Sequence, residues 1–481
     1  MRMSDSIRNI TTNGIGWSAV ERFSSQGISF LIQIVLARLL TPSDYGIIGM
    51  IAVFLQVSQV FVDSGFANAL IQKKECTEED YSTVFFYNLS VSLIIYILLF
   101  VLSPFVANFY NIEIITCVLR VLSLIVIINA LIIVQKTILT KKVDFKSQSK
   151  TTILSSSISG FIGVFAAYMG YGVWALVIQQ LLNGLFQVLA LFLIVRWTPR
   201  WNLISKESFN HVLNFGSKLL LASLISVLYK NLYTILIGKL FSAKDLGNYS
   251  RAESFAIFPS SNIGQIISRV SYPVLSRIQD NDKLLIHSYK KMIQYSSFMI
   301  FPMMIGIVSL SEPFVMTVLS PKWSGCITLL QILSLSWMLD HICLLNLNLL
   351  YVKGRTDLVL RLEVIKKSIA ISILVGTVPL GIEIMCWGLV AYSVIAVIIN
   401  SYYTNRILQY GFLRQLLDYL PCFLSSVLMG IIVYLSISYF DSYFKKLFFG
   451  ILIGVASYGL LSMILFRDII NNIVLVLKIK K

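Results

Sequence analysis

The sequence predicts an all-α, polytopic membrane protein of about 14 transmembrane helices, in two parallel six-helix lobes plus two carboxyl-terminal helices. Composition is the first reason: 57% of the 481 residues are hydrophobic and only 13% are charged, unlike a water-soluble globular chain. The second reason is that apolar runs of about 20 residues, enough to cross a bilayer, recur from end to end. The third is an internal repeat, in which the stretch 34–46 returns at 235–247.

The apolar runs define the expected spans in order along the chain. Leu89–Val106 is free of charge, and Val118–Val134 contains one charged residue, Arg120. The segments between the runs are short, so no separate water-soluble domain is expected. The expected spans cover residues 15–36, 47–66, 84–106, 114–135, 151–169, 173–195, 213–237, 253–272, 292–311, 326–350, 362–380, 384–403, 419–440 and 447–466.

The distribution of Lys and Arg predicts the orientation of the chain. With the amino terminus in the cytoplasm, the inside segments hold about four times as many basic residues as the outside loops, as the positive-inside rule requires. We therefore expect both termini to be cytoplasmic. The net charge of +16 is then a topology signal rather than a nucleic-acid surface, and it favours contact with anionic membrane lipids.

The internal repeat predicts the domain organisation. "IVLARLLTPSDYG" (Ile34–Gly46) and "ILIGKLFSAKDLG" (Ile235–Gly247) end the first and the seventh spans. Because six spans separate them, the halves have the same orientation and are parallel repeats about an axis along the membrane normal. We expect an amino-terminal lobe at 1–200 (spans 1–6), a carboxyl-terminal lobe at 201–405 (spans 7–12), and spans 13 and 14 with a cytoplasmic tail at 406–481.

Each copy of the repeat ends in a corner that contains Asp and Gly. Asp44 and Gly46 in the first copy correspond to Asp245 and Gly247 in the second. Asp favours helix capping and Gly permits close backbone packing. We interpret these residues as structural.

Polar side chains form stripes on several expected spans, at helical spacing on otherwise apolar helices. The stripe on span 1 corresponds to the stripe on span 7, and each contains one cation. Such matched polar faces predict a hydrated, cationic cavity, because a charge near the bilayer centre needs water or a partner. The cavity-lining residues predicted in this way are Arg22, Gln26, Ser29, Gln33, Gln59, Asp63, Arg120, Ser226, Lys230 and Thr234.

Two alternatives stay open for the charged residues inside the spans. Arg22 has a structural alternative, an ion pair with Asp63. Glu21, Glu253 and Asp340 are candidates for binding a coupling ion or proton, and structural pairing explains each of them equally well.

The sequence contains no recognisable catalytic or cofactor motif. It has no P-loop, H-E-x-x-H, G-x-S-x-G or C-x-x-C pattern, and five of its six cysteines lie in or beside apolar spans. We therefore expect no metal ion, no cofactor and no enzymatic activity.

Three stretches of the sequence carry a family resemblance. "GWSAVERFSSQGISFLIQIVLARLLTPSDYGIIGM" through "DSGFANALIQKK", the hairpin "YGVWALVIQQLL" and the segment "VRWTPRW" resemble the polysaccharide transporter family. That family comprises Wzx-type O-antigen and exopolysaccharide repeat-unit flippases, the lipopolysaccharide biosynthesis proteins of the multidrug/oligosaccharidyl-lipid/polysaccharide (MOP) superfamily. The resemblance implies fourteen helices in the MATE-like, two-lobed fold of that superfamily.

The resemblance also implies a function and its partners. It implies that the chain translocates undecaprenyl-diphosphate-linked oligosaccharides across the bacterial cytoplasmic membrane by alternating access, without a nucleic-acid partner. A polysaccharide polymerase and glycosyltransferases are the protein partners that fit this role. A hydrated groove suits such a substrate, since burying one unpaired hydroxyl costs roughly 2–7 kcal/mol and a bare charge costs more.

Two alternative functions remain. A cation-coupled multidrug exporter of the same superfamily would favour an acidic cavity, whereas Arg22 and Lys230 are cations. A polytopic polysaccharide polymerase or ligase would typically expose a large outer loop with catalytic basic residues, and the outside loops expected here are short.

Overall fold

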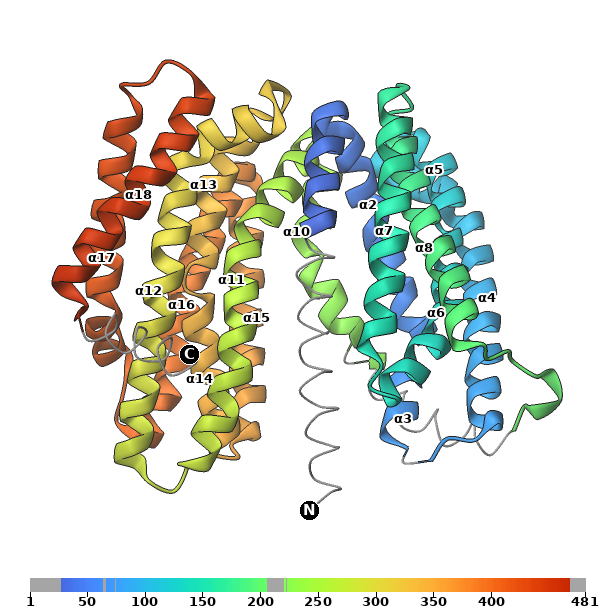
Figure 1. Cartoon of the computed structure of the whole chain (residues 1–481), viewed down its shortest axis with the longest axis horizontal. Helices are drawn as coiled ribbons and strands as arrows, with labels where there is room; N and C mark the ends of the chain where they lie inside the picture. Colours follow the sequence, from blue (N-terminus) through green and yellow to red (C-terminus); the bar gives the residue numbers. More distant parts are fainter. Residues whose placement is uncertain (1–26, 64–65, 74, 206–219, 222, 468–481) are drawn as a thin grey trace. The chain divides into compact units, whose positions relative to one another are not determined.

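The computed structural model describes residues 27–63, 66–73, 75–205, 220–221 and 223–467. The chain divides into two compact units, Met1–Gly247 and Asn248–Lys481. All regular elements within the described ranges are helices (Figure 1), as the sequence predicts.

The first unit is a bundle of long helices and a few short ones. It begins in the described part of the chain with an apolar helix, Gly27–Leu39. The elements that follow are α2 (Pro42–Asp63), α3 (Phe66–Gln72), α4 (Glu78–Tyr110), α5 (Ile114–Leu122), α6 (Leu124–Lys141), α7 (Phe145–Tyr168), α8 (Val173–Val195), the 3₁₀ turn η1 (Trp201–Leu203) and α10 (Leu232–Leu240).

The second unit contains the remaining helices. The first turn of α11 still belongs to the first unit, because the division between the units falls after Gly247. The elements are α11 (Ala243–Arg277), α12 (Asp282–Phe314), η2 (Val315–Leu319), η3 (Pro321–Trp323), α13 (Cys326–Trp337), α14 (Asp340–Val352), α15 (Thr356–Thr377), η4 (Val378–Leu380), α16 (Ile382–Leu408), α17 (Phe412–Ile437) and α18 (Tyr443–Leu465).

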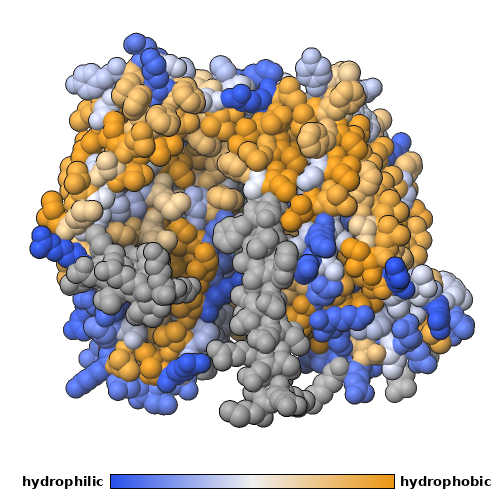
Figure 2. All heavy atoms as spheres, viewed as in Figure 1, coloured by the Kyte–Doolittle hydropathy of each residue, from blue (hydrophilic) through white to orange (hydrophobic). Residues whose placement is uncertain are grey.

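Ten helical segments of the described residues are long and apolar enough to cross a membrane. Figure 2 shows apolar residues over the sides of the helices and hydrophilic residues gathered at their ends. Expected spans 253–272 and 362–380 fall on α11 and α15, which are long but more polar. Spans 15–36 and 213–237 lie partly outside the described residues. With these four added to the ten segments, the structure is compatible with fourteen spans. The ten segments are Pro42–Asp63, Glu78–Tyr110, Ile114–Lys141, Phe145–Tyr168, Val173–Val195, Asp282–Leu319, Cys326–Val352, Ile382–Leu408, Phe412–Ile437 and Tyr443–Leu465.

Helices at corresponding positions of the two halves have similar lengths and similar breaks. Both α4 and α12 have 33 residues, and each begins at a capping side chain, Thr77 or Asn281. The next span is broken in both halves, at Ser123 between α5 and α6 and at Met338–Leu339 between α13 and α14. The sequence predicts the repeat but shows no sign of these breaks. Their common position adds a structural argument for a duplicated six-helix unit.

The repeat-based boundary at 200/201 differs from the division between the compact units. Residues 223–247, which include α10 and the start of α11, belong by their contacts to the first unit. The two boundaries differ because the repeat is defined by sequence similarity, whereas the compact units are defined by which helices contact one another.

The repeated corners are capping boxes. Thr41 Oγ1 donates to Asp44 Oδ2 at 2.7 Å, and the backbone N–H of Thr41 donates to the same oxygen at 2.9 Å. Ser242 and Asp245 make the equivalent bonds, at 2.7 Å and 3.2 Å. Each Asp is therefore the third helical residue of the helix that begins at the corner, where a carboxylate satisfies free N–H groups.

The two corners also touch each other. A Cβ atom built on Gly46 would lie 1.7 Å from the carbonyl oxygen of Ala243, and one built on Gly247 would lie 1.8 Å from that of Pro42. Ala243 and Pro42 occupy equivalent positions, so the contact is reciprocal: the first turn of each helix crosses the other at backbone distance. Only glycine permits such an approach, as at other close helix crossings in membranes.

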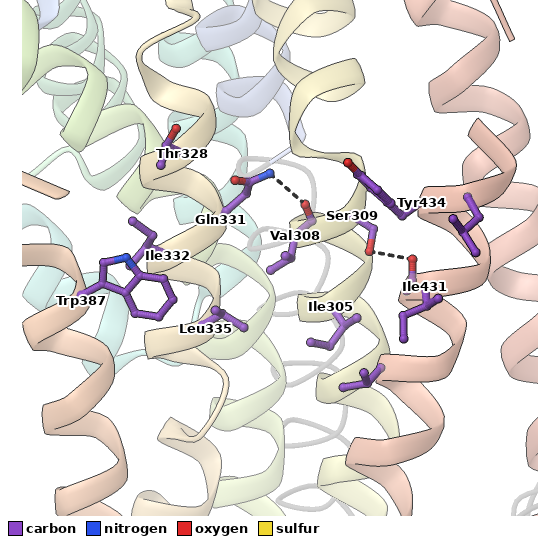
Figure 3. A pocket seen from close by; sticks show the side chains of 13 residues that line it. Ile305, Val308, Ser309, Thr328, Gln331, Ile332, Leu335, Trp387, Ile431 and Tyr434 are labelled. Atoms are coloured by element: carbon purple, nitrogen blue, oxygen red, sulfur yellow. Dashed lines mark hydrogen bonds between the residues drawn. The ribbon is translucent and has the colours of Figure 1, made fainter. Parts of the chain in front are cut away.

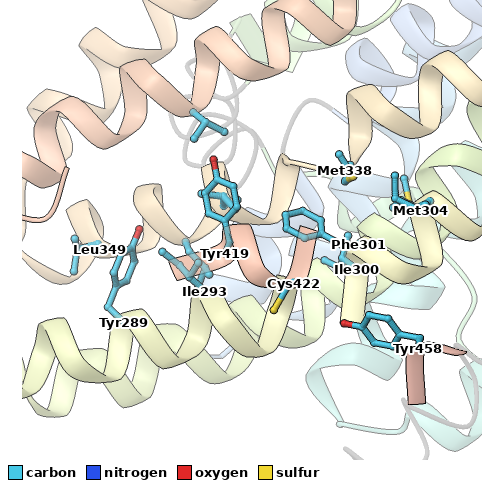
Figure 4. Packing of buried hydrophobic residues seen from close by; sticks show 14 of the residues in the cluster. Tyr289, Ile293, Ile300, Phe301, Met304, Met338, Leu349, Tyr419, Cys422 and Tyr458 are labelled. Carbon is cyan, nitrogen blue, oxygen red and sulfur yellow. The ribbon is translucent and has the colours of Figure 1, made fainter. Parts of the chain in front are cut away.

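The core of the second unit includes the two helices that follow the repeat. Phe301 of α12 packs edge-to-face against Tyr419 of α17 (Figure 4), with ring centroids 5.9 Å apart, and against Phe423 of the same helix at 5.8 Å. Tyr458 of α18 donates its hydroxyl to the carbonyl of Phe298 at 2.9 Å. Helices α17 and α18 thus complete this core rather than lying outside it.

A buried amide pair ties α17 to α14. Asn346 and Gln415 exchange side-chain hydrogen bonds of 3.0 and 3.1 Å, and Thr404 of α16 donates to Asn346 Oδ1 at 2.6 Å. All three side chains are inaccessible to solvent. Reciprocal amide bonds satisfy polar groups that would otherwise be unpaired in an apolar interior.

Alanine in place of Gly247 should destabilise the fold. The added methyl group overlaps the Pro42 carbonyl, so the helices must separate, at a cost of about 1–3 kcal/mol. Thermal unfolding in detergent should show a lowered midpoint for Gly247→Ala and for Gly46→Ala. Gly459→Ala is the matched control, since nothing lies within 4 Å of its Cβ position. Equal midpoints for all three variants would contradict the close crossing.

Leucine in place of Gln415 should destabilise the second unit by leaving Asn346 incompletely bonded. The expected loss is about 1–3 kcal/mol. Asn346→Leu combined with Gln415→Leu should lose less than the sum of the single losses, which a double-mutant cycle of thermal or denaturant unfolding measures. Strictly additive losses would contradict a direct pair.

Candidate functional site

The expected polar stripe on the first span is only partly described. Arg22, Gln26 and Glu21 lie outside the described residues. On the helix Gly27–Leu39, Ser29 is half-buried and Gln33 is exposed. The arrangement of this stripe around Arg22 therefore stays a prediction.

The polar face of α2 contacts two other helices of the first unit. Asn129 of α6 donates to Gln59 Oε1 at 3.0 Å, and Asn231 donates to Gln56 Oε1 at 3.0 Å. Asp63 ends α2 half-buried, and one of its carboxylate oxygens is buried without a hydrogen-bond partner among the described residues. These side chains form a polar contact between helices of the first unit, which we call the polar seam; its members are Gln56, Gln59, Asp63, Asn129 and Asn231.

Polar residues missed at the sequence level extend this seam across α6, α7 and α8. Lys136 Nζ donates to Gln187 Oε1 at 3.2 Å, and Gln187 Nε2 donates to Thr152 Oγ1 at 3.3 Å. The sequence does contain a signal on α8: Gln180, Asn183 and Gln187 recur at helical spacing. A half-buried ammonium among amide and hydroxyl groups is suited to an anionic or polyhydroxylated ligand.

Arg120 is directed toward α4. Its Nε donates to Ser103 Oγ at 2.9 Å, and its guanidinium carbon lies 4.4 Å from the centroid of the Phe100 ring. The side chain is half-buried. Hydroxyl and aromatic contacts of this kind hold a guanidinium at membrane depth.

The described part of the seventh span places its polar residues at different exposures. Ser226 and Thr234 are half-buried, whereas Lys230 is exposed and the adjacent Asn231 is buried. The Lys230 ammonium is therefore accessible, while its neighbour anchors the helix to α2.

The acidic residues considered for coupling occupy different surroundings in the second unit. Tyr249 donates its hydroxyl to Glu253 at 3.1 Å. Asp340 is exposed at the start of α14. An ion pair, missed at the sequence level, joins Nζ of the buried Lys366 to Oε1 of the half-buried Glu363 at 2.6 Å on α15.

His341, next to Asp340, is fully buried, and both of its ring nitrogens have hydrogen-bond partners, as in a structural histidine. Its ring nitrogens lie 3.0 Å from Ser297 Oγ and 3.0 Å from the Met338 carbonyl oxygen. A carbonyl oxygen can only accept a hydrogen bond, so Nδ1 carries the proton and donates to Met338, and Nε2 of the neutral ring accepts a hydrogen bond from the Ser297 hydroxyl. Within the described residues, no group of three or more His, Cys, Asp or Glu side chains is placed to hold a metal ion.

An apolar groove of about 510 Å³ opens on the second unit (Figure 3), among α12, α13, α16 and α17. Its polar side chains bond to backbone: Ser309 Oγ donates to the Gly430 carbonyl, and Gln331 Nε2 donates to the Val308 carbonyl. Trp387 and Tyr434 are exposed along it. This lining suits a hydrocarbon chain rather than a sugar.

Comparison with known proteins gives consistent matches over most of the chain. A family model described as "Polysaccharide biosynthesis protein" matches residues 35–328. The chain is 25% identical over 433 residues to the teichuronic acid biosynthesis protein TuaB of Bacillus subtilis (strain 168), covering 89% of each. It is 25% identical over 402 residues to the lipopolysaccharide biosynthesis protein WzxC of Escherichia coli (strain K12), covering 82% of this chain and 81% of that protein.

A solved structure shares the fold. The lipid II flippase MurJ, in an inward closed conformation, superposes with a TM-score of 0.74 at 18% identity, covering 94% of this chain and 99% of that one. At this identity the similarity establishes the architecture.

Proposed function

Because the chain belongs to the polysaccharide biosynthesis protein family, we propose that it is a flippase for lipid-linked oligosaccharides. Its substrate would be an undecaprenyl-diphosphate-linked repeat unit for O-antigen, capsule or exopolysaccharide. The names of TuaB and WzxC, and the fold shared with a lipid II flippase, support this substrate class. The protein then acts as a transporter in the bacterial cytoplasmic membrane, with both termini in the cytoplasm.

The observation that carries the proposal is the polar seam inside the first unit. A diphosphate and its sugars cannot enter a hydrocarbon core about 30 Å thick without replacement of their hydration. The amides of Gln59 and Asn129 and the ammonium of Lys136 offer such replacement at membrane depth. The prenyl tail needs no such help, and it can remain in lipid.

The expected cavity residues take roles that follow from their chemistry. Arg22 and Lys230 would neutralise the diphosphate, and Ser29, Ser226 and Thr234 would face the sugars. Alternating access then moves the headgroup from the inner to the outer leaflet. Glycosyltransferases would supply the substrate on the inner side, and a polysaccharide polymerase would consume it on the outer side.

The two lysines Lys136 and Lys230 favour this function over the two alternatives. An exporter of organic cations needs carboxylates where Lys136 and Lys230 lie. A polymerase or ligase needs a water-exposed catalytic surface outside the membrane, and from α10 to α18 the described helices are joined by short connections.

Deletion of the gene tests the function directly. Lipid-linked repeat units should accumulate on the cytoplasmic leaflet, and surface polysaccharide should be lost. Mass spectrometry of extracted lipids, combined with periodate labelling of intact cells, measures both. Normal surface polymer without accumulated intermediate would contradict the proposal.

Charge reversal at Lys230 should reduce export strongly. Lys230→Glu places a carboxylate where the diphosphate is expected, and we expect a loss of about tenfold or more, equivalent to ~1.4 kcal/mol. Arg22→Glu should behave in the same way. Lys244→Glu, an exposed residue in the first turn of α11, is the matched control and should export normally. Full export by Lys230→Glu at wild-type abundance would remove this residue from the site.

Two substitutions of Lys136 test whether export depends on its ammonium group. Lys136→Arg keeps the cation and should retain most of the export, whereas Lys136→Met keeps the length and removes the charge and should lose it. Export per unit of membrane-inserted protein is the measurement. Equal export by the two variants would show that the charge of Lys136 is not used.

A further inference from the structure

The chain leaves α8 through a sharply turned segment, residues 196–205. Arg196 adopts a left-handed conformation (φ 54°), which redirects the backbone away from the helix axis. Figure 1 shows the segment as a green loop beside the amino-terminal end of α4. Neither the seam nor the apolar groove includes these residues.

The 196–205 segment is held firmly against α4. Trp197 donates its indole N–H to Glu78 Oε2 at 2.7 Å. The backbone N–H groups of Arg200 and Ser205 donate to the hydroxyls of Ser82 and Thr83, at 3.2 and 2.9 Å respectively. A segment with three such bonds presents its outward side chains in a fixed arrangement.

The outward side chains combine a large aromatic ring with two cations. Trp201 is 71% exposed although its ring packs edge-on against Phe86, with centroids 4.6 Å apart. Ile204 is 47% exposed, and Arg196 and Arg200 are exposed. Exposed aromatic and aliphatic groups beside arginines need an amphipathic partner.

The position of the segment along the helices identifies that partner. Leu193 and Ile194, in the last turn of α8 before Arg196, are exposed apolar residues. On α4, the exposed apolar run begins at Leu93, seven residues after Phe86, or about 10 Å along the helix. The segment therefore lies just beyond the lipid-facing surface, at the depth of the headgroups, where Trp is favoured.

We propose that the 196–205 segment is a binding surface for anionic glycerophospholipids of the adjacent leaflet. The Trp201 ring lies among the headgroups and upper acyl carbons, and Arg196 and Arg200 bind lipid phosphates through charge-assisted hydrogen bonds. Glu78 is engaged by Trp197, and the exposed Glu75 and Glu79 at this end of α4 confine phosphate contact to the arginine side. The proposal does not depend on the transported substrate.

Fluorescence quenching tests the position of Trp201. Wild-type protein and Trp201→Phe are reconstituted in nanodiscs of phosphatidylcholine and phosphatidylglycerol with a headgroup-nitroxide lipid. The emission lost on substitution should be the emission that the nitroxide lipid quenches. Quenching of this component by a water-soluble quencher alone would overturn the proposal.

A lipid comparison tests the two arginines. Phosphatidylglycerol should raise the thermal midpoint of the wild type above its value in pure phosphatidylcholine, because a ligand that binds the folded state stabilises it. Arg196→Gln combined with Arg200→Gln should lose most of that gain. Arg406→Gln with Arg414→Gln, two exposed arginines of the second unit, makes the same charge change and should retain it. An unchanged gain in the first pair, or equal losses in both pairs, would overturn the phosphate contact.

Discussion

The close crossing of two helix beginnings is the constraint on which the first unit depends. Gly46 and Gly247 each receive a backbone carbonyl where any other residue would place a Cβ atom. The capping boxes at Asp44 and Asp245 fix the direction in which each helix leaves this crossing. In a membrane the hydrophobic effect does not drive helices together. Close packing at small residues and satisfied N–H groups at the helix starts stabilise the association here instead.

The interior of the first unit follows from a second constraint, that polar groups in a membrane need partners. The bonds of Asn129 with Gln59 and of Gln187 with Lys136 meet this need between helices rather than within them. Such bonds can be exchanged for bonds to a ligand at little net cost, because both arrangements satisfy the same groups. A transported headgroup could therefore pass along a seam that is also structurally complete without it.

The sequence predicts the helices and the duplicated corner well because both are local patterns. Apolar length locates the spans, and the repeated Asp and Gly locate the corner, where the structure adds Thr41 as the partner of Asp44 in a capping box. The polar seam is harder to predict. The spacing of polar residues along α2 shows on which face Gln59 lies, but not which helix that face contacts. Lys136 lies one residue beyond the expected span 114–135, and only the packing of α6 against α8 places it beside Gln187. The breaks at Ser123 and Met338–Leu339 leave no mark in hydropathy.

The dependence of the second unit on α17 has a consequence for how the protein is made. Gln415, which completes the bonds of Asn346, is synthesised almost seventy residues after it. Helices α14 and α16 must therefore wait in the membrane with the hydrogen bonds of Asn346 incomplete until α17 leaves the ribosome. During that interval an insertase or a protease can act on the incomplete chain. A premature stop anywhere before α17 would thus be expected to remove the protein from the cell rather than yield a shortened transporter.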